Sequence, residues 1–286
     1  MRAAPGRQQT LNLCKRWPMN TEHIAWNKSA EVALPASQKV GGIEQIRTLT
    51  RYSDPQALEL ANSRVGSRLV KIRAADSDGH RSSANILIKR RYEWRGYQGA
   101  SLPLDYNANR ITLSATEHDE TIGTITVGLD SQEGLLAEDV FPGEVASLRA
   151  QGRRVCEFTK LAMDPIDGAK RVLSSLFHVA FIVAHRIKRC DTLVLEVNPR
   201  HVNYYKRMLG CAVLGEERQN RRVNAPAVLL WLDFPYVDEQ ITKLAGTAGL
   251  EASDRSLYPY FFSLAEETGI ISRLHGCPWL TSTFQA

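Results

Sequence analysis

The chain has 286 residues, of which 43% are hydrophobic and 23% are charged, and its net charge is +5 at pH 7. These values are typical of a globular protein and exclude wholesale disorder and a fibrous architecture. The longest apolar run, residues 179–184, is far shorter than the roughly 20 residues that a membrane-spanning helix needs, so we expect no membrane span.

The five cysteines are scattered along the chain without any CxxC pair, at Cys14, Cys156, Cys190, Cys211 and Cys277. An odd number of unclustered thiols is typical of a reducing compartment. We therefore predict free thiols, a cytoplasmic location and no metal site.

The N-terminal part has an irregular pattern, and we interpret residues 1–67 as a partly flexible extension. Residues 1–21 carry no acidic residue, which indicates a basic tail or, alternatively, an organellar transit peptide. Candidate helices cover residues 42–52 and 55–64. The alternation of apolar and basic residues over 68–74 then predicts a half-buried strand.

A helix is expected over residues 80–92, after a turn with helix-start chemistry. Residues 110–115 and 121–128 are rich in β-branched side chains on both sides of a polar run, which predicts an antiparallel hairpin. A short helix to residue 150 follows, with a proline in its first turn. The next strand is predicted over residues 155–163, ended by an Asp-Pro pair.

An apolar stripe at helical spacing predicts a helix over residues 172–188 that packs on a sheet. The apolar run 192–197 predicts a buried strand, and a short helix over 202–208 ends at a glycine. Two further strands, at residues 211–217 and 225–233, precede a helical extension over 234–286 that includes a helix at 257–274. This order implies an α/β fold with a mixed sheet covered by helices on both faces.

Four strings within this pattern resemble one family in combination. They are YEWRGY (92–97), IGTITVGLDS (122–131), CEFTKLAMDP (156–165) and LEVNPRHVNYYKRMLGC (195–211). Together they are similar to the long-chain N-acyl amino acid synthases, a FeeM-like family of the GNAT acyltransferase superfamily that is related in fold to acyl-homoserine-lactone synthases. The resemblance covers residues 68–233.

The resemblance implies a GNAT-like, mostly antiparallel sheet and an N-acyltransferase. Such an enzyme moves a long-chain acyl group from an acyl carrier protein, or from acyl-coenzyme A, to the α-amine of an amino acid by direct attack. The acyl-phosphopantetheine donor is then a co-substrate, and no tightly bound cofactor is expected. We also expect the strands that end at Met163 and Val197 to part and admit the thioester-bearing arm.

The turn before the helix at 172 is the candidate phosphate site, because a helix start presents free N–H groups and a positive dipole. Its residues are Asp167, Gly168, Ala169, Lys170 and Arg171. The superfamily usually has an Arg/Gln-x-x-Gly-x-Gly/Ala stretch here, and its absence favours a carrier-protein donor over coenzyme A. The alternative is a merely solvated helix start.

Amide formation needs a neutral amine, and Glu157, in mid-strand, is the first candidate for the general base. The alternative is an ion pair of Glu157 with Arg153 or Lys160, and Glu196 is a second candidate base. Tyr205 occupies the position where the resembled enzymes often place the tyrosine that protonates the leaving thiolate. An aromatic that only packs on the sheet is the alternative.

Two further groups complete the predicted site. Asn198 and His201 could bind the pantetheine amides or cap the following helix. Arg95, between Trp94 and Tyr97, is the candidate partner for the substrate carboxylate, and an arginine stacked on Trp94 is the alternative.

Other functions stay open from the sequence. An acyl-homoserine-lactone synthase or a small-acyl GNAT acetyltransferase would share this fold. A silent GNAT-like binding module is the non-enzymatic alternative, with nucleic acid as a ligand given the basic run at residues 89–91. Because 31 acidic residues are interspersed and no nucleic-acid motif is present, we expect no nucleic-acid partner. The sequence does not indicate an oligomeric state.

Overall fold

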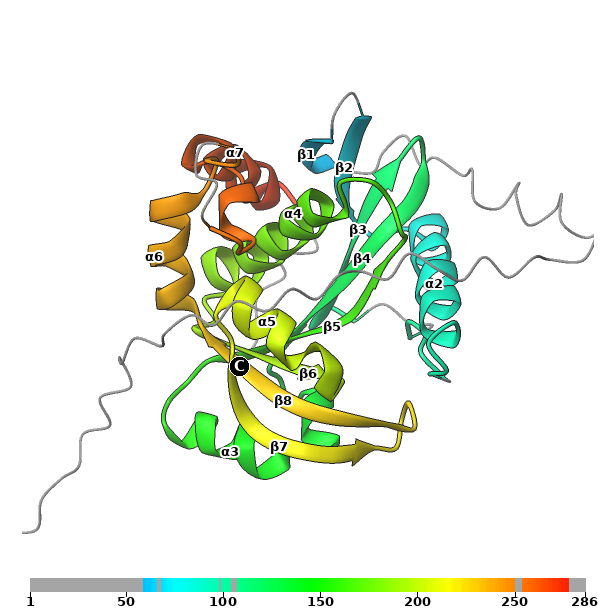
Figure 1. The fold of residues 1–286 in the computed structure, drawn as a ribbon, viewed down its shortest axis with the longest axis vertical. Helices are drawn as coiled ribbons and strands as arrows, with labels where there is room; N and C mark the ends of the chain where they lie inside the picture. Colours follow the sequence, from blue (N-terminus) through cyan, green and yellow to red (C-terminus); the bar gives the residue numbers. More distant parts are fainter. Residues whose placement is uncertain (1–58, 66–67, 98, 104–106, 250–253, 278–286) are drawn as a thin grey trace, which may run out of the picture. The chain divides into compact units, whose positions relative to one another are not determined.

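The computed structural model describes residues 59–65, 68–97, 99–103, 107–249 and 254–277 (Figure 1). The basic tail, the candidate helix at 42–52 and Cys14 lie outside these residues. The four described cysteines are buried, and Cys156, Cys190 and Cys211 are free thiols.

One mixed sheet forms the centre, with the strand order β1-β2-β3-β4-β5-β6-β8-β7. The strands are β1 (Glu59–Val65), β2 (Arg68–Ala74), β3 (Arg110–Glu117), β4 (Glu120–Leu129), β5 (Val155–Met163), β6 (Thr192–Val197), β7 (Ala212–Asn220) and β8 (Ala225–Asp233). Within this sheet only β5 and β6 run parallel, and every other neighbouring pair is antiparallel. The predicted fold class, a mixed and mostly antiparallel sheet, is confirmed.

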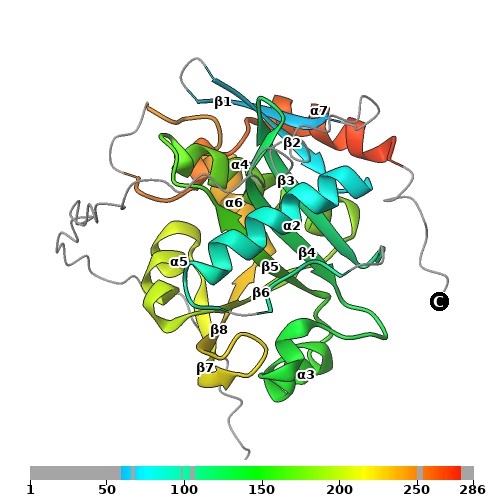
Figure 2. The same cartoon turned by 90° about the vertical axis from the view of Figure 1, so that its right-hand side faces the viewer.

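Helices cover both faces of the sheet, as predicted (Figures 1 and 2). The α-helices are α2 (Asp78–Glu93), α3 (Pro142–Ala150), α4 (Ala169–Phe181), α5 (Val202–Leu209), α6 (Phe234–Leu244) and α7 (Leu264–His275). The shorter helices are η1 (Leu136–Asp139), η3 (Pro199–His201), η4 (Tyr258–Tyr260) and a π-helix, η2 (Ile182–Ile187), that continues α4. Helix α2 lies on one face of β3–β5, and α4 lies on the other with α6 and α7 outside it.

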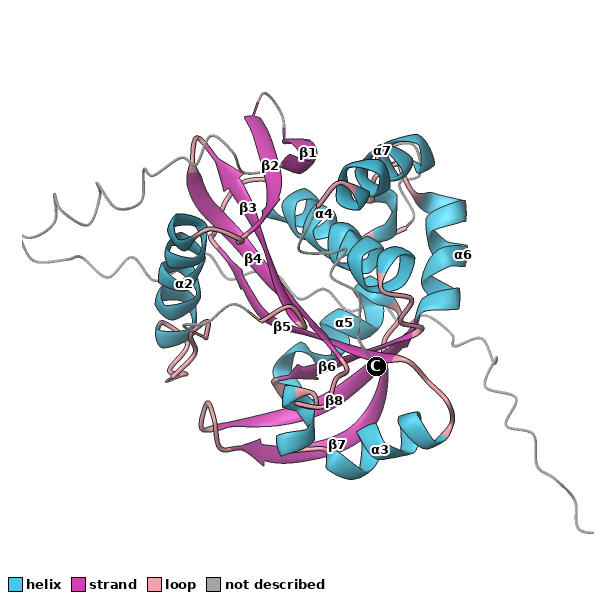
Figure 3. Cartoon of the chain, turned by 180° about the vertical axis from the view of Figure 1, so that it is seen from behind, coloured by secondary structure: helices cyan, strands magenta, loops and turns pink. Residues whose placement is uncertain are grey.

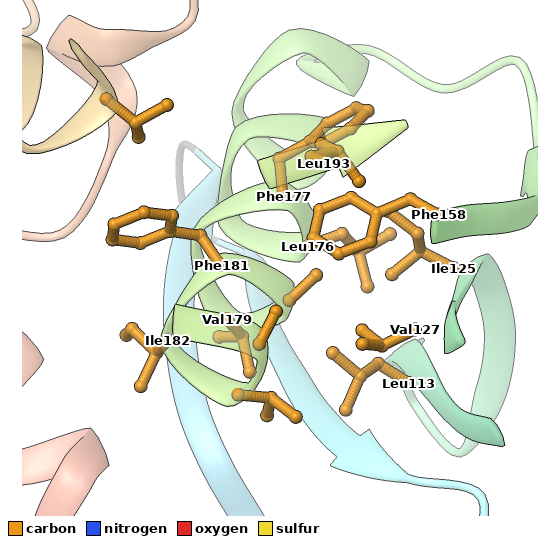
Figure 4. Packing of buried hydrophobic residues seen from close by; sticks show 14 of the residues in the cluster. Leu113, Ile125, Val127, Phe158, Leu176, Phe177, Val179, Phe181, Ile182 and Leu193 are labelled. Carbon is orange, nitrogen blue, oxygen red and sulfur yellow. The ribbon is translucent and has the colours of Figure 1, made fainter. Parts of the chain in front are cut away.

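The main core lies between α4 and the sheet (Figure 4). The helix buries Leu176 and Val179, two members of the apolar stripe seen in the sequence, and faces Leu113, Ile125 and Phe158 of the strands. Each such side chain contributes roughly 1.5–3 kcal/mol when fully buried. A smaller core joins α3 to the β7–β8 hairpin (Figure 3).

Three predicted elements differ from the structure. The helix expected at 55–64 is wrong over its described part, because residues 59–65 form β1 and pair with β2. The helix expected from residue 172 begins at Ala169, so the connection between β5 and this helix is shorter than predicted. The helix expected from residue 257 begins at Leu264, after η4 and a capping box at Ser263.

Buried ionic contacts tie the C-terminal helices to α4 and its π-helix. Glu267 of α7 lies 3.3 Å from His178 Nε2 and accepts a hydrogen bond from Arg186 Nε at 2.7 Å. Asp238 of α6 lies 3.1 Å from His185 Nε2 and also pairs with Arg186. The described residues after β8 are therefore packed into the same core as the sheet.

Candidate active site

The parallel pair, β5 and β6, opens after three residue pairs. The last pair joins Glu157 to Val194, and beyond it the two strands are not paired with each other. On its other side β5 stays paired with β4 as far as Met163. Unpaired backbone N–H and C=O groups along such an opening can bind an extended arm. The expected parting of the strands that end at Met163 and Val197 is confirmed.

A β-bulge bends β5 close to the point where it leaves β6. The register with β4 shifts between Thr124 and Thr126, and Lys160 has a left-handed φ of 50°. The Thr124 hydroxyl donates a hydrogen bond to the Lys160 carbonyl at 2.9 Å. Bulges bend the strand that carries them, which accounts for the parting of β5 from β6.

The predicted phosphate site lies at the start of α4. Gly168 is the N-cap with a φ of 75°, a conformation that favours glycine, and no side chain caps this helix. Ala169, Lys170 and Arg171 form its first turn, and the Asp167 carbonyl accepts a hydrogen bond from the Arg68 side chain.

Lys170 and Arg171 both contact the C-terminal segment. Lys170 Nζ donates to the Arg255 carbonyl at 3.1 Å and lies 4.5 Å from the ring centroid of Tyr260, and the Arg171 guanidinium lies 5.6 Å from the same ring. Burial lowers the pKa of Lys170. The helix start thus has two cations held in place beside it, rather than only solvated ones.

Tyr205 lies on α5, which ends at Gly210 as the sequence predicts. Its ring centroid is 6.4 Å from that of Phe177, which in turn lies 6.2 Å from Phe158, the first β5 residue beyond the paired segment. The ring therefore stands beside the opening between the strands. Burial raises the pKa of Tyr205 well above its usual range, so its phenol stays protonated at neutral pH.

The segment that follows α2 holds the predicted substrate-binding residues. Trp94 is 73% exposed, and the cation that lies over its ring is Arg91, at 5.0 Å, so the alternative of Arg95 on Trp94 is wrong. Tyr97 accepts a hydrogen bond from Arg200 Nη2 at 2.7 Å. Arg95 itself is exposed.

Asn198 and His201 lie directly after β6. The Asn198 side chain accepts a hydrogen bond from the Arg200 N–H at 3.2 Å and donates to the Pro226 carbonyl at 3.4 Å, so it caps η3. His201 Nε2 is buried and has no hydrogen-bond partner among the described residues. Burial, together with the charges of Arg95 and Arg200, lowers the pKa of His201.

Glu196 faces the same region from β6. Its carboxylate accepts hydrogen bonds from Asn220 Nδ2 and, at 2.9 Å, from Arg222 Nη2. Burial raises the pKa of Glu196, which makes it a stronger base than an exposed glutamate.

Glu157 is 1% exposed and fully engaged in hydrogen bonds. Arg110 Nη1 donates to Oε1 at 2.7 Å, and the backbone N–H groups of Leu136 and Ala137 donate at 2.9 Å and 3.0 Å. An ion pair exists, but its cation is Arg110, on a strand 47 residues away, and not Arg153 or Lys160. The role of general base stays a prediction for Glu157, and these contacts favour a structural role.

The predicted residues thus gather in two places. Burial, the largest cause, raises the pKa of Tyr92 and Tyr205 and lowers that of His201. The charge of Arg95 acts on all three groups in the lowering direction, so these groups lie near one another at the end of β6. The phosphate-site residues lie at the start of α4. Glu157 belongs to neither group.

Sequence reasoning missed Arg110, Thr159 and Lys160. A lysine inside the apolar strand CEFTKLAM was the available signal, because lysine is rarely buried without a purpose. Among the described residues no cluster of His, Cys, Asp or Glu is arranged to hold a metal ion. In the same part of the chain no helix is long and apolar enough to cross a membrane.

The site therefore combines an opened parallel pair, a helix start shortly after β5 and a partly buried tyrosine on α5. The family model described as N-acyl amino acid synthase FeeM matches residues 83–233, more than half of the chain, from α2 to the end of β8. The chain belongs to this family of N-acyl amino acid synthases.

Solved structures agree with this fold. The structure of FeeM, an N-acyl amino acid synthase from uncultured soil microbes, is 24% identical, with a TM-score of 0.53 over 59% of this chain and 92% of that one. Weaker likenesses are a GNAT-family acetyltransferase from Streptococcus pneumoniae (15% identity, TM-score 0.41, 57% and 99% of the two chains) and the acyl-homoserine-lactone synthase LasI (13%, 0.41, 59% and 91%). No curated protein sequence matches the chain.

Proposed function

We propose that this protein transfers a long-chain fatty acyl group from the phosphopantetheine arm of an acyl carrier protein to the α-amine of an amino acid. The observation that carries the proposal is the opening of β5 from β6, in a chain of the N-acyl amino acid synthase family. Only residues 164–168 separate β5 from α4. An arm along the unpaired edge of β5 can therefore rest its phosphate at the helix start.

A basic surface at the start of α4 supports a carrier protein as the donor. It consists of Lys170, Arg171, Arg207 and Arg255, which we call the α4 basic surface. Burial lowers the pKa of Lys170, the nearby Asp254 carboxylate raises it, and the charge of Arg207 lowers it, so α5 and α4 contribute to one surface. Arg207 and Arg255 are exposed and can meet an acidic partner. The acyl-phosphopantetheine group is then a co-substrate, and no tightly bound cofactor takes part.

The chemistry needs three proton transfers. The substrate ammonium gives a proton to a base, the neutral amine attacks the thioester carbonyl, and the C–S bond breaks as the amide forms. We propose Glu196 as the base, because burial raises its pKa. The carboxylate of Glu157 is instead occupied by hydrogen bonds from Arg110 and from the backbone of η1. Tyr205, which stands at the opening, protonates the leaving thiolate, and the proton that the nitrogen loses as the amide forms restores the Tyr205 phenol. Glu196 then releases its proton to solvent.

We place the reaction in the cytoplasm. Cys156 and Cys190 are buried free thiols, and Cys190 is close enough to Cys156 to raise the pKa of that thiol, to which burial makes the larger contribution. Neighbouring thiols that stay unpaired suit a reducing compartment.

The test is a reconstituted reaction with purified protein, a mixture of the twenty amino acids and dodecanoyl carrier protein or dodecanoyl-coenzyme A, read by mass spectrometry. We expect an N-dodecanoyl amino acid with the carrier-protein donor. Charge reversal on the α4 basic surface, Arg207→Glu, should lower kcat/KM for the carrier protein about tenfold and leave coenzyme A turnover unchanged. Lys243→Glu on α6, whose side chain is 64% exposed, is the matched control.

The outcomes separate the possible functions. An acyl-homoserine lactone formed only with S-adenosylmethionine, or acetylation of an amine from acetyl-coenzyme A without long-chain activity, would refute the proposal. An N-dodecanoyl amino acid formed only with dodecanoyl-coenzyme A would support an amino acid as the acceptor and refute the carrier protein as the donor.

A further inference from the structure

A small cavity lies on the α2 face of the sheet, beside the bulge of β5. Its volume is about 110 Å³, and its walls come from α2 and the segment after it, from β3, β4 and β5, and from η1. Thr159 and Lys160 of β5 line it, immediately beyond the last residue paired with β6. The cavity therefore opens beside the point where an acyl thioester would reach the sheet.

Among the described residues, two polar groups of this cavity have no partner. Thr159 Oγ1 is buried and makes no hydrogen bond among the described residues. The Lys160 side chain is half-buried, and in the described part of the chain it has no hydrogen bond and no ion pair. Burial lowers the pKa of Lys160, and the charges of Arg222 and Arg110 lower it further. An anion bound in the cavity would satisfy both groups.

The charges on the cavity wall also favour an anion. The charged residues that line it are Arg81, Arg110 and Lys160, and no described carboxylate does so. Arg110 is neutralised by Glu157, and Arg81 donates a hydrogen bond to the Pro103 carbonyl at 2.6 Å, so Lys160 is the cation of the described wall that an anion would pair with. A larger cavity of about 610 Å³ at the start of β5 is different, because its Arg149, Arg153 and Arg154 are each paired with an aspartate.

The size of the cavity selects the ligand. A volume of about 110 Å³ is several times the roughly 10–15 Å³ that one water molecule needs, so the cavity has room for a small group of atoms such as a carboxylate with its α-carbon and nitrogen. We place the long acyl chain elsewhere.

We propose that this cavity binds the α-carboxylate of the amino-acid acceptor, with Lys160 as its ion-pair partner and Thr159 as a hydrogen-bond donor. The inference rests on the proposed function, which supplies the amino acid. It also moves the carboxylate site from Arg95, which is exposed beyond the end of α2, to the bulge of β5. The amine then points toward the opening between β5 and β6.

The test compares an amino acid with its amide, in which the carboxylate is neutral. The acceptor is the amino acid that the wild-type protein acylates, varied at saturating acyl donor. We expect the wild type to prefer the acid over the amide about 10- to 100-fold in kcat/KM, as a charge-assisted hydrogen bond allows. Lys160→Met should raise the KM for the acid by a similar factor, change kcat little and abolish the preference over the amide.

Three variants complete the design. Lys160→Arg should restore most of the acid preference, because it keeps the charge. Lys89→Met, at an exposed lysine of α2, and Arg95→Met should leave the preference unchanged. Circular dichroism establishes that each variant is folded.

The results distinguish the inference from the proposed function. If the wild type acylates an amino acid and Lys160→Met keeps the acid preference, the cavity assignment is overturned while the function stands. If only the Arg95→Met variant loses the preference for the acid over the amide, Arg95 and not Lys160 binds the substrate carboxylate. If the wild type acylates no amino acid, both proposals fall together.

Discussion

Replacing Glu157 by glutamine tests whether this residue holds the fold or takes part in the reaction. The carboxylate is 1% exposed and accepts three hydrogen bonds, one from Arg110 and two from the backbone of η1. The amide of glutamine has one accepting oxygen in place of two, and it carries no charge. At least one donor is then left without an acceptor, and the Arg110 guanidinium loses its counter-charge.

The expected loss of stability follows from these contacts. Removing one partner of a buried ion pair costs about 3–5 kcal/mol, and the Arg110 side chain is 17% exposed, so we take the lower part of that range, about 3–4 kcal/mol. For a domain of this size each kcal/mol lowers Tm by about 2–4 °C. We therefore expect Glu157→Gln to lower Tm by about 6–16 °C.

Thermal unfolding followed by circular dichroism measures this change. Glu239→Gln is the control, because Glu239 pairs with Lys243 on the surface of α6, and exposed pairs contribute less than about 1 kcal/mol. A Glu157→Gln protein with the Tm of the wild type and no turnover would refute the structural role and restore Glu157 as the general base.

Three further outcomes test other regions. Gly168→Ala should lower stability by about 1–3 kcal/mol in thermal melting, because its φ is 75° and the added methyl group would clash with Val65. Tyr205→Phe should lower kcat about 100-fold or more and leave Tm unchanged, if the phenol protonates the thiolate. Burial lowers the pKa of His178 in the folded protein. Below a pH of about 6.5 the His178 side chain is therefore protonated more readily in the unfolded chain than in the folded one, and the free energy of unfolding should fall as the pH drops further. Urea unfolding should show that His178→Asn weakens this dependence.

The sequence predicts most strands around the site because each is a local pattern. Runs of apolar and β-branched residues that end in Asp-Pro and Asn-Pro define β5 and β6 with the bounds that the structure shows. The strand β1 is missed because ELANSRV is rich in good helix formers, and it becomes a strand only through its pairing with β2.

The contacts of single side chains are harder to predict. Nothing near Glu157 in the sequence points to Arg110, since the pair depends on the register of β3, β4 and β5. The bulge at Lys160 likewise arises from a shift between two strands and not from a glycine. The sequence therefore predicts the strands and helices that form the site, but it does not predict which charged side chains pair within it.

The helices that follow β8 bear on any attempt to shorten or recombine this enzyme. The family match stops at Asp233, yet Phe234, Phe261 and Leu274 pack on the outer side of α4. Arg186 is paired with Glu267 and Asp238, which also lie beyond the match. A fragment trimmed to the matched region would expose the apolar outer side of α4 to solvent and leave the Arg186 side chain without its carboxylate partners. Chimaeras between members of the family should therefore exchange α6, η4 and α7 together with α4, and the junction should lie beyond His275.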